Sequence, residues 1–290
     1  MSSLVFLNGK FIHKEQAKIS PFDRAFMFGD AVYEGVPIYE KQAFLLKEHY
    51  TRFTKNLKKI NISQPLSIDN FKNIIATLAN QATTPESFGI YFQISRGVQD
   101  SRSHKYDVSI KPTIFACIQP TTKVDFRSYK NGFIAHAELD TRWHKPHIKS
   151  TSLLANILHL KNNTIETILY DQDLNFTEGC SSNVFFVEQE TIITPPKTSN
   201  ILPGITRSHI FSIAESLGIK IIEKNCNFKD MHHYQEAFIT GAYKEVAPII
   251  KINETIIGNG VPGKIWEKIY IEYKASIKKL STSLCLSAIK

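Results

Sequence analysis

The sequence has few of the features that mark membrane, fibrous or disulfide-stabilised proteins. No window approaches the roughly 18 consecutive apolar residues of a transmembrane helix, so none is expected. The 13 glycines and 12 prolines are too few for a collagen-like or low-complexity chain of 290 residues. The four cysteines form no CxxC pair and have no zinc-like spacing with histidine, so we expect neither a metal site nor a disulfide framework. The chain also lacks a Walker loop, a Rossmann glycine run and a nucleophile elbow.

The composition is that of a globular protein with an excess of positive charge. Hydrophobic residues make up 42% and charged residues 21%, and the length suggests two domains. The net charge of +8 suits an anionic ligand, a nucleic acid or an acidic membrane surface. The densest basic run, Lys55, Lys58 and Lys59, fits the solvated face of an amphipathic helix. Residues 1–10 show no signal-peptide pattern, so we expect a soluble, cytoplasmic protein with no membrane partner. The charge alone does not require a nucleic acid, and we expect no nucleic-acid partner.

The first half of the chain predicts a mixture of strands and helices. Asn8-Gly9 lies between two short apolar runs and predicts a hairpin, because this pair accepts the positive φ angles of a type I′ turn. Apolar residues three and four apart predict amphipathic helices, and short apolar runs predict strands. The elements expected here are strands 5–7 and 10–12, helices 47–60 and 68–80 with Ser67 as N-cap, strands 90–95 and 113–119, and a long polar loop at 96–111.

The second half predicts a similar mixture and defines a larger domain. A helix opens at Pro203-Gly204 and is closed by Gly218, and the tail after Leu280 is expected to be loose. The other elements expected are strands 132–139, 167–170, 184–187, 191–194 and, as the last clear strand, 236–240, an apolar helix through 153–160 and a terminal helix from about 263. We therefore expect an N-terminal α/β domain at 1–120, a linker at 121–127 and a C-terminal domain at 128–290, with a ligand cleft between the domains.

Lys149 is a candidate nucleophile. It follows the polar, Trp-containing stretch 142–148 and precedes three hydroxyl residues at the mouth of an apolar helix. Desolvation and nearby cations lower the proton affinity of a lysine, and the neutral amine is the nucleophile of a Schiff-base lysine. A surface lysine is the plain alternative, and position alone favours it.

Two further segments could hold an anionic ligand. In residues 177–183, Glu178 precedes small and hydroxyl residues that can donate hydrogen bonds, and its carboxylate could hold a protonated ring nitrogen. Gly204-Ile205-Thr206 opens a helix, whose first N–H groups form a phosphate site helped by the helix dipole. A polar hairpin loop and an ordinary helix start are the plain alternatives.

Two segments of the first half combine charged and aromatic residues. Residues 23–35 lie close to glycine and, taken alone, fit a structural turn with a paired aspartate and arginine. Arg102-x-His104 lies in the long loop, and this pair can grip a carboxylate by a bidentate fork and a single donor. A solvated loop is equally ordinary.

The order of the motifs along the chain carries more information than any one of them. The motifs are Asp23-Arg24-x-x-x-Phe28-Gly29-Asp30-x-Val32-Tyr33-Glu34, His49-x-x-Arg52, Ile148-Lys149-Ser150, Thr177-Glu178-Gly179 with Ser182-Asn183-Val184-Phe185, and Leu202-x-Gly204-Ile205-Thr206-Arg207. Over about residues 6–273 this order resembles the class IV, or fold-type-IV, pyridoxal-phosphate-dependent aminotransferases. Within that family the sequence is most similar to the D-amino acid aminotransferases. This likeness rests on Tyr33 and on the segment 91–97, which leads to Arg102-x-His104.

The resemblance implies an α/β (α+β) fold of two domains with pyridoxal 5′-phosphate in the cleft between them. It implies that Lys149 holds the cofactor as an internal aldimine and then carries a proton between the substrate α-carbon and the cofactor. Glu178 would keep the pyridine nitrogen protonated, so that the ring can take up negative charge. The other implied cofactor residues are Arg52, Ile205 and Thr206 at the phosphate, Ser181 and Ser182 nearby, Leu202 on the ring face, and Ala242, where the family often has a hydroxyl residue.

The resemblance also implies how the substrate and a partner chain are used. The implied α-carboxylate trap consists of Tyr33, Arg102 and His104. The loop carrying the last two reaches the partner's site in this family, which implies a homodimer. Three departures stand out: Cys180 replaces a smaller residue, Ala242 lacks the hydroxyl, which should cost on the order of 1 kcal/mol of one hydrogen bond, and Tyr243 adds bulk near the expected substrate pocket.

The sequence thus predicts a pyridoxal-phosphate-dependent aminotransferase that moves the amino group of a D-amino acid, such as D-alanine, to a 2-oxo acid such as 2-oxoglutarate. Alternatives within the family are a branched-chain L-amino acid aminotransferase, whose pattern Gly35 fits better, and a 4-amino-4-deoxychorismate lyase. Arg102-x-His104 counts against the lyase, because the pair suits a simple amino acid carboxylate. A basic nucleic-acid-binding protein is a distant alternative that rests only on the charge.

Overall fold

The chain forms two compact units. The computed structural model describes residues 3–63, 65–83, 87–121 and 126–287. The first unit consists of residues 1–123 and 148–153, and the second of residues 124–147 and 154–290. The linker predicted at 121–127 lies largely outside the described residues, and the predicted domain ranges remain predictions.

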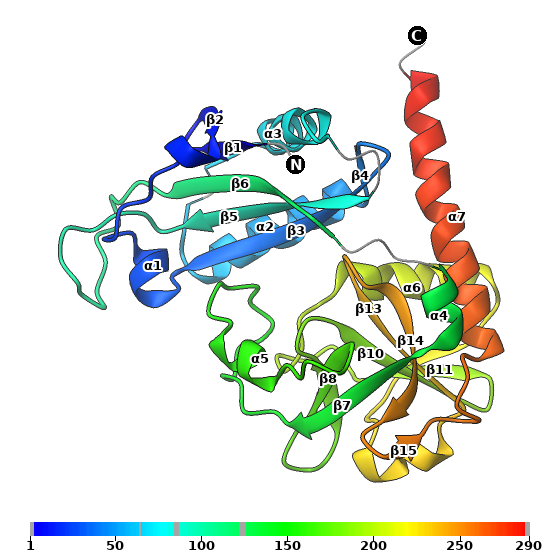
Figure 1. Cartoon of the computed structure of the whole chain (residues 1–290). Helices are drawn as coiled ribbons and strands as arrows, with labels where there is room; N and C mark the ends of the chain where they lie inside the picture. Colours follow the sequence, from blue (N-terminus) through cyan, green and yellow to red (C-terminus); the bar gives the residue numbers. More distant parts are fainter. Residues whose placement is uncertain (1–2, 64, 84–86, 122–125, 288–290) are drawn as a thin grey trace. The chain divides into compact units, whose positions relative to one another are not determined.

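The first unit is built on an antiparallel sheet of six strands in the order β2-β1-β6-β5-β3-β4 (Figure 1). Its elements are β1 (Leu4–Leu7), β2 (Lys10–His13), the 3₁₀ helix η1 (Lys14–Gln16), α1 (Arg24–Phe28), β3 (Ala31–Tyr39), β4 (Gln42–Ala43), α2 (Leu46–Lys59), α3 (Ile68–Asn80), β5 (Phe88–Ser95) and β6 (Thr113–Gln119). Asn8 and Gly9 have φ angles of 47° and 90°, so the predicted hairpin is confirmed.

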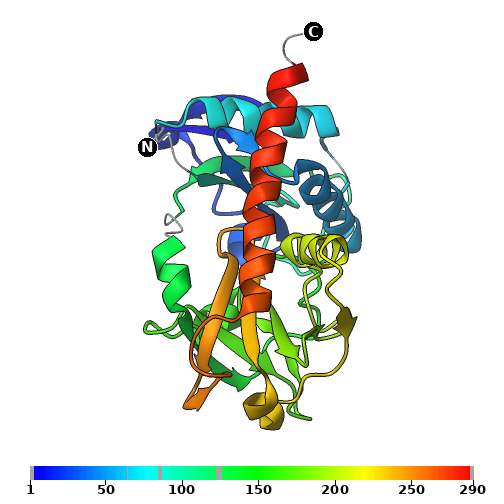
Figure 2. The same ribbon diagram turned by 90° about the vertical axis from the view of Figure 1, so that its right-hand side faces the viewer.

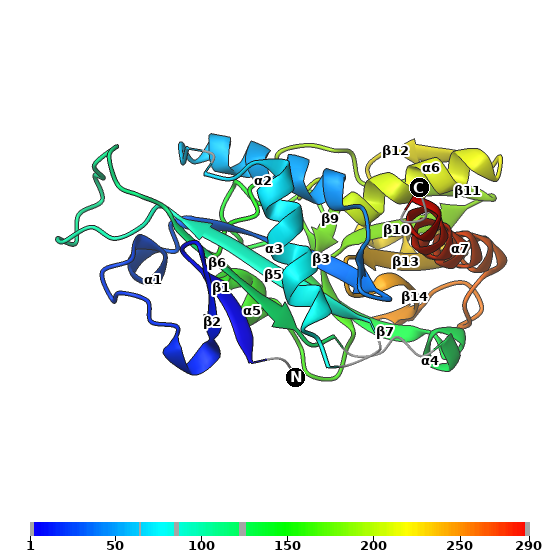
Figure 3. The ribbon, with the colours of Figure 1, turned by 90° about the horizontal axis from the view of Figure 1, so that it is seen from above.

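The core of the first unit lies between the sheet and helices α2 and α3, of which α2 runs along β3 and α3 crosses the strands (Figure 3). Phe53 of α2, Phe71 of α3 and Phe92 of β5 meet there, with ring centroids 4.8–5.9 Å apart. The Ser67 hydroxyl accepts a hydrogen bond from Asn70 N and caps α3, as predicted. The apolar residues of both helices therefore pack into the core, as their spacing predicted, and this packing holds α2 against β3.

The second unit is built on a mixed sheet of nine strands in the order β12-β11-β10-β13-β14-β7-β8-β9, with β15 beside β14. Its elements are α4 (Phe126–Asn131), β7 (Phe133–Leu139), α5 (Leu154–His159), β8 (Glu166–Tyr170), β9 (Phe176–Gly179), β10 (Asn183–Glu188), β11 (Thr191–Thr194), α6 (Ile205–Ser216), β12 (Ile221–Glu223), the 3₁₀ helix η2 (Phe228–His233), β13 (Glu236–Gly241), β14 (Glu245–Ile252), β15 (Thr255–Ile256) and α7 (Lys264–Ser287).

Helix α7 lies against β13 and β14, next to α6 (Figure 2). Glu236 of β13 accepts hydrogen bonds from the first amides of the helix, Ile265 N at 2.9 Å and Trp266 N at 2.7 Å. The carboxylate thus satisfies orphan donors and interacts favourably with the helix dipole. Within the described residues, no helix combines the length and the apolar character that a membrane span requires.

Three expectations about the elements are wrong. Residues 236–240 are not in the last strand, because β14 follows with Pro248 inside it. A proline argues against a strand, because it lacks the N–H that a second neighbouring strand would need. Pro248 pairs with β13 alone, since the pairing of β14 with β7 begins only at Ile249. Strand β3 was missed for a related reason, since it contains Gly35 and Pro37. The tail after Leu280 is helical to Ser287, because no glycine or proline interrupts residues 264–287.

Candidate active site

Lys149 lies on an extended segment of the first unit that runs beside β3. The amide of Tyr33 donates to the carbonyl of Lys149 at 3.0 Å, and Ser150 forms a β-bridge with Val32. The amide of Thr151 donates to the carbonyl of Ala31 at 3.1 Å. These bonds fix the lysine backbone more firmly than a helix mouth would, and α5 begins only at residue 154.

The side chain of Lys149 lies over an aromatic ring. Its Nζ is 4.3 Å from the ring centroid of Tyr33, and Tyr33 stacks on Tyr91 with a centroid distance of 5.6 Å. A ring face attracts an ammonium group, so the arrangement orients Nζ. The structure thus brings together Lys149 and Tyr33, two of the predicted site residues.

Arg52 is held by a buried carboxylate. Its Nε and Nη2 donate to Glu34 of β3 at 2.7 Å and 2.8 Å, while His49 Nδ1 lies 2.8 Å from the same carboxylate. Burial works to raise the pKa of Glu34. The charge and hydrogen bonds of Arg52, together with the hydrogen bond of His49, nevertheless lower this pKa to about 2. Burial lowers the pKa of His49, although the hydrogen bond and the charge of Glu34 act in the opposite direction. Arg52 is therefore a fixed cation in the middle of α2.

Arg102 and His104 lie in the loop between β5 and β6 and are exposed. Both lie near the ring of Phe28, with the Arg102 guanidinium carbon 4.9 Å from its centroid and the His104 ring 5.6 Å away. Both predicted carboxylate ligands of the loop thus contact the same aromatic ring. Tyr33, the third member of the predicted trap, is held by a different set of contacts on β3.

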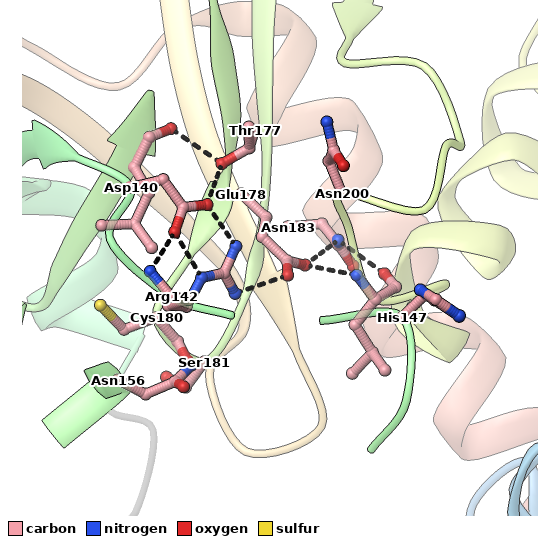
Figure 4. A network of polar contacts seen from close by, with 12 residues as sticks. Asp140, Arg142, His147, Asn156, Thr177, Glu178, Cys180, Ser181, Asn183 and Asn200 are labelled. Atoms are coloured by element: carbon pink, nitrogen blue, oxygen red, sulfur yellow. Dashed lines mark hydrogen bonds and ion pairs between the residues drawn. The ribbon is translucent and has the colours of Figure 1, made fainter. Parts of the chain in front are cut away.

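In the second unit, Glu178 is the centre of a buried polar network (Figure 4). Its Oε1 accepts a hydrogen bond from Arg142 Nη1 at 2.8 Å. Its Oε2 accepts from Asn183 Nδ2 at 3.1 Å and from the amide of Leu202 at 2.9 Å. Asp140 binds the other side of Arg142, with Oδ2 2.8 Å from Nη2. Both oxygens of the Glu178 carboxylate are therefore fixed in position.

The environment of Glu178 weakens its acidity. Burial raises the pKa of this carboxyl to about 7, although Arg142 and the amide of Leu202 act in the opposite direction. The negative charge of Asp140 adds to the rise. A cationic group placed beside Glu178 would favour its ionised form, so this carboxyl can respond to the charge of a ligand.

Ser181 and Ser182 both bind a second buried carboxylate. Their hydroxyls donate to Glu166 Oε2 at 3.0 Å and 2.7 Å. Lys244 Nζ lies 2.9 Å from the same oxygen and 2.9 Å from Ser181 Oγ. The serine hydroxyl protons are thus directed at Glu166, and Lys244 balances its charge.

The first turn of α6 offers backbone donors. The helix begins after Gly204 without a side-chain cap, and Ile205 and Thr206 are its first residues. A Cβ at Gly204 would collide with the amide oxygen of Asn183, so only glycine fits. This N-terminus can bind an anion such as phosphate.

A polar atom without a partner lies in the strand beside this turn. Thr240 pairs with Asn183 across strands β13 and β10, and its hydroxyl is buried without a hydrogen bond to any described residue. Such an atom calls for a ligand or a water. Ala242 follows two residues later, at the turn into β14, and contributes no hydroxyl.

Within each unit, the structure gives the predicted residues partners that the sequence did not identify. The motifs contained Glu34 and Asn183, but their roles in holding Arg52 and Glu178 were not predicted. Arg142 was noted only as part of a polar stretch, and Glu166 and Lys244 were missed. The rule that a buried carboxylate needs a cation could have prompted a search for Arg142, but it does not select one arginine from many. No cluster of His, Cys, Asp and Glu suited to a metal ion occurs among the described residues.

Comparison with protein families places these residues in a known context. The model of the family "Amino-transferase class IV" matches residues 31–252. The chain is 32% identical over 277 residues to a D-alanine aminotransferase of Bacillus licheniformis, covering 94% of this chain and 96% of that protein. A D-alanine aminotransferase of Staphylococcus haemolyticus is 31% identical over 283 residues, covering 94% and 99% of the two chains.

Solved structures show the same fold. The branched-chain amino acid aminotransferase of Escherichia coli superposes with a TM-score of 0.84 at 22% identity, covering 93% of this chain and 92% of that one. The enzyme of Thermoproteus uzoniensis with norvaline gives 0.83 at 24% identity, covering 94% of each chain. A putative branched-chain amino acid aminotransferase of Thermotoga maritima gives 0.79 at 22% identity, covering 94% and 95%. At these identities the likeness establishes the fold alone.

Proposed function

The chain belongs to the class IV aminotransferase family, and we propose that it is a pyridoxal-phosphate-dependent D-amino acid aminotransferase. It moves the amino group of a D-amino acid such as D-alanine to a 2-oxo acid such as 2-oxoglutarate. The observation that carries the proposal is the likeness to D-alanine aminotransferases over 94% of the chain. The placement of Arg102 and His104 around one aromatic ring supports the same substrate class.

The residues of both units fit the cofactor of this family. The units supply the amine of Lys149 for covalent attachment, the buried carboxylate of Glu178 for a ring nitrogen, and the N-terminus of α6 for a phosphate. Pyridoxal 5′-phosphate supplies an electron sink for the negative charge that forms when the substrate α-proton leaves. The amine of Lys149 would hold the cofactor and, once displaced by the substrate, would take up and return the substrate α-proton. The ring of Tyr33 keeps that amine oriented.

Glu178 holds the proton on the ring nitrogen. Its carboxyl has a pKa of about 7 without a ligand, and an adjacent ring cation favours the ionised form. Arg142, Asn183 and the Leu202 amide keep the carboxylate in place. The carboxylate therefore binds the charged ring without reorganisation, which is the preorganisation that lowers a barrier.

Arg52 and the amides of Ile205 and Thr206 bind the phosphate. Arg52 is a fixed cation because Glu34 binds its guanidinium through two nitrogens. Ser181 and Ser182 contribute indirectly, since their hydroxyls donate to Glu166. The remaining proposed cofactor contacts are Leu202 on the ring face and Ala242, whose missing hydroxyl weakens the phosphate site.

The substrate carboxylate is bound by Tyr33, Arg102 and His104, the last two serving the partner of a homodimer. Helix α5 supports a protein interface, because its apolar residues, expected to be buried, are largely exposed. Leu154 is 70% exposed and Leu158 71%. An exposed apolar cluster of this kind marks an interaction surface. A cytoplasmic location remains a prediction.

The visible absorbance of the purified holoenzyme, before and after each candidate substrate, tests the proposal. We expect a cofactor band that D-alanine alone converts to the pyridoxamine form, and no conversion in Lys149→Ala. Conversion by L-leucine alone would assign the protein to the branched-chain aminotransferases, and release of pyruvate from a chorismate-derived amine would assign it to the lyases. Normal turnover by Lys149→Ala would refute the mechanism.

A further inference from the structure

The loop that carries Arg102 and His104 has no helix or sheet of its own, yet it is tied to the body of the first unit at several points. Arg24 of α1 is 4% exposed, and its Nη1 and Nη2 donate to the carbonyls of Ser103 and His104 at 2.6 Å and 3.3 Å. Two backbone oxygens of an exposed loop are thereby fixed by one buried guanidinium. The backbone on both sides of the His104 side chain is therefore held in one position without a ligand.

Arg24 is itself held in one orientation. Its Nε donates to Asp30 at 2.8 Å, and Arg96 donates to the same carboxylate at 2.7 Å and 3.0 Å. The two arginines lower the pKa of Asp30 against the effect of burial, so the carboxylate stays ionised. The guanidinium carbon of Arg96 also lies 3.7 Å from the ring centroid of Tyr106, two residues beyond His104 in the loop. The loop is therefore clamped from both ends of the segment 103–106.

Phe28, the last residue of α1, contacts the side chains of the loop as well. Its ring centroid is 4.7 Å from the Arg24 guanidinium carbon and 4.9 Å from that of Arg102, and the His104 ring is tilted against it at 5.6 Å. Gly29 follows in the left-handed conformation, with a φ of 66°, and fixes where α1 ends. One ring thus contacts both anion-binding side chains of the loop and the arginine that holds the loop backbone.

We propose that Phe28 is a positioning residue for substrate recognition, because its ring, backed by Arg24, holds Arg102 and His104 together for the substrate α-carboxylate. This inference rests on the proposed function, which assigns those two residues to the carboxylate. Exposed arginine and histidine side chains otherwise sample many rotamers, and fixing them on binding costs free energy. The ring removes part of that cost in advance. The ring contacts described for Phe28 are with Arg24, Arg102 and His104, so we expect its effect to fall on carboxylate binding.

The test compares Phe28→Leu, which removes the ring, with Phe28→Tyr, which keeps it. The matched control is Phe26→Leu on the same helix, where the side chain is 78% exposed. In the holoenzyme we expect Phe28→Leu to raise the KM for D-alanine about five- to tenfold with little change in kcat, the size of one lost cation–π contact and one ring contact. Phe28→Tyr and Phe26→Leu should behave like the unmodified protein.

Two further readouts distinguish positioning from a general structural defect. The dissociation constant of acetate, a carboxylate without an amine, measured by its perturbation of the cofactor absorbance, should rise by the same factor in Phe28→Leu. The rate at which ethylamine, an amine without a carboxylate, converts the cofactor band should not change. An equal loss with ethylamine, or an unchanged acetate affinity, would overturn the inference.

Arg102→Ala separates this inference from the function on which it depends. If Arg102→Ala leaves the KM for D-alanine and the acetate affinity unchanged, the assignment of the loop to the carboxylate fails, and the inference fails with it. If Arg102→Ala weakens both while Phe28→Leu does not, the carboxylate assignment stands and the role of Phe28 is wrong.

Discussion

Replacing Glu34 by glutamine should destabilise the first unit in a way that depends on pH. Glu34 has no exposed surface and binds two nitrogens of Arg52, with His49 on the same carboxylate. Glutamine has nearly the same shape but no charge, and it replaces one of the two carboxylate oxygens that bind Arg52 with an NH₂ donor. The substitution therefore removes the partner of a buried cation, which is the costly way to break an ion pair.

The magnitude follows from the pKa of Glu34. The carboxyl falls from an ordinary value of 4.5 to about 2 in the folded protein. A difference of about 2.5 pKa units corresponds to about 3 kcal/mol, at about 1.4 kcal/mol per unit. Because the folded pKa is the lower one, this stability is fully present above pH 4.5 and is lost as the pH falls towards 2. At pH 3 about half of it remains.

Urea unfolding of the cofactor-free protein at pH 7 and at pH 3 measures this difference. Far-UV circular dichroism is the suitable signal, because Trp143 and Trp266 both belong to the second unit and their fluorescence does not follow the first. Glu48→Gln, an exposed carboxyl on the same helix as Arg52, is the matched control and should change little. If Glu34→Gln lowered the free energy of unfolding equally at both pH values, or not at all, the ion-pair reasoning would be wrong.

Three further substitutions probe the cofactor site and the proposed interface. Ala242→Thr should restore one hydrogen bond and tighten pyridoxal phosphate about fivefold by equilibrium titration, without changing the affinity for pyridoxal, which has no phosphate. Leu158→Glu should shift the protein from dimer to monomer in sedimentation equilibrium, because it places a charge in the exposed apolar surface of α5. Lys244→Met should lower the melting temperature, because the buried carboxylate of Glu166 loses its counter-ion, and adding Glu166→Gln should recover most of that loss. Lys251→Met breaks an exposed ion pair and should have little effect on the melting temperature.

Elements with a strong local signal were predictable from the sequence. Helices α2 and α3 and the hairpin of β1 and β2 follow from apolar spacing, the Ser67 cap and the Asn8-Gly9 turn. Strands β3 and β14 were not predictable in this way, because Pro37 and Pro248 argue against a strand wherever both edges are paired. Only the sheet order shows where one edge is free, and sheet order is a non-local property.

For the site, the sequence indicated the residues but not what holds them. The order of the motifs resembles that of the family, and this resemblance singled out Lys149 and Glu178, although each residue taken alone had a plain structural alternative. It did not show that residues 148–153 run beside β3, nor that Arg142 binds Glu178. Such contacts join segments about 36 to 118 residues apart, and periodicity carries information only within a single element.

The buried carboxylates of this chain differ in a way that assigns them different tasks. Burial works to raise the pKa of Asp30, Glu34 and Glu178 alike. Arginines reverse the effect for the first two, which remain ionised and orient the cations around them. Glu178 also has an arginine, but Arg142 divides its hydrogen bonds between this carboxylate and Asp140, whose charge adds to the rise. A cationic ligand can therefore change the charge of Glu178 near neutral pH, and this difference in environment supports its proposed place beside the ring nitrogen of the cofactor.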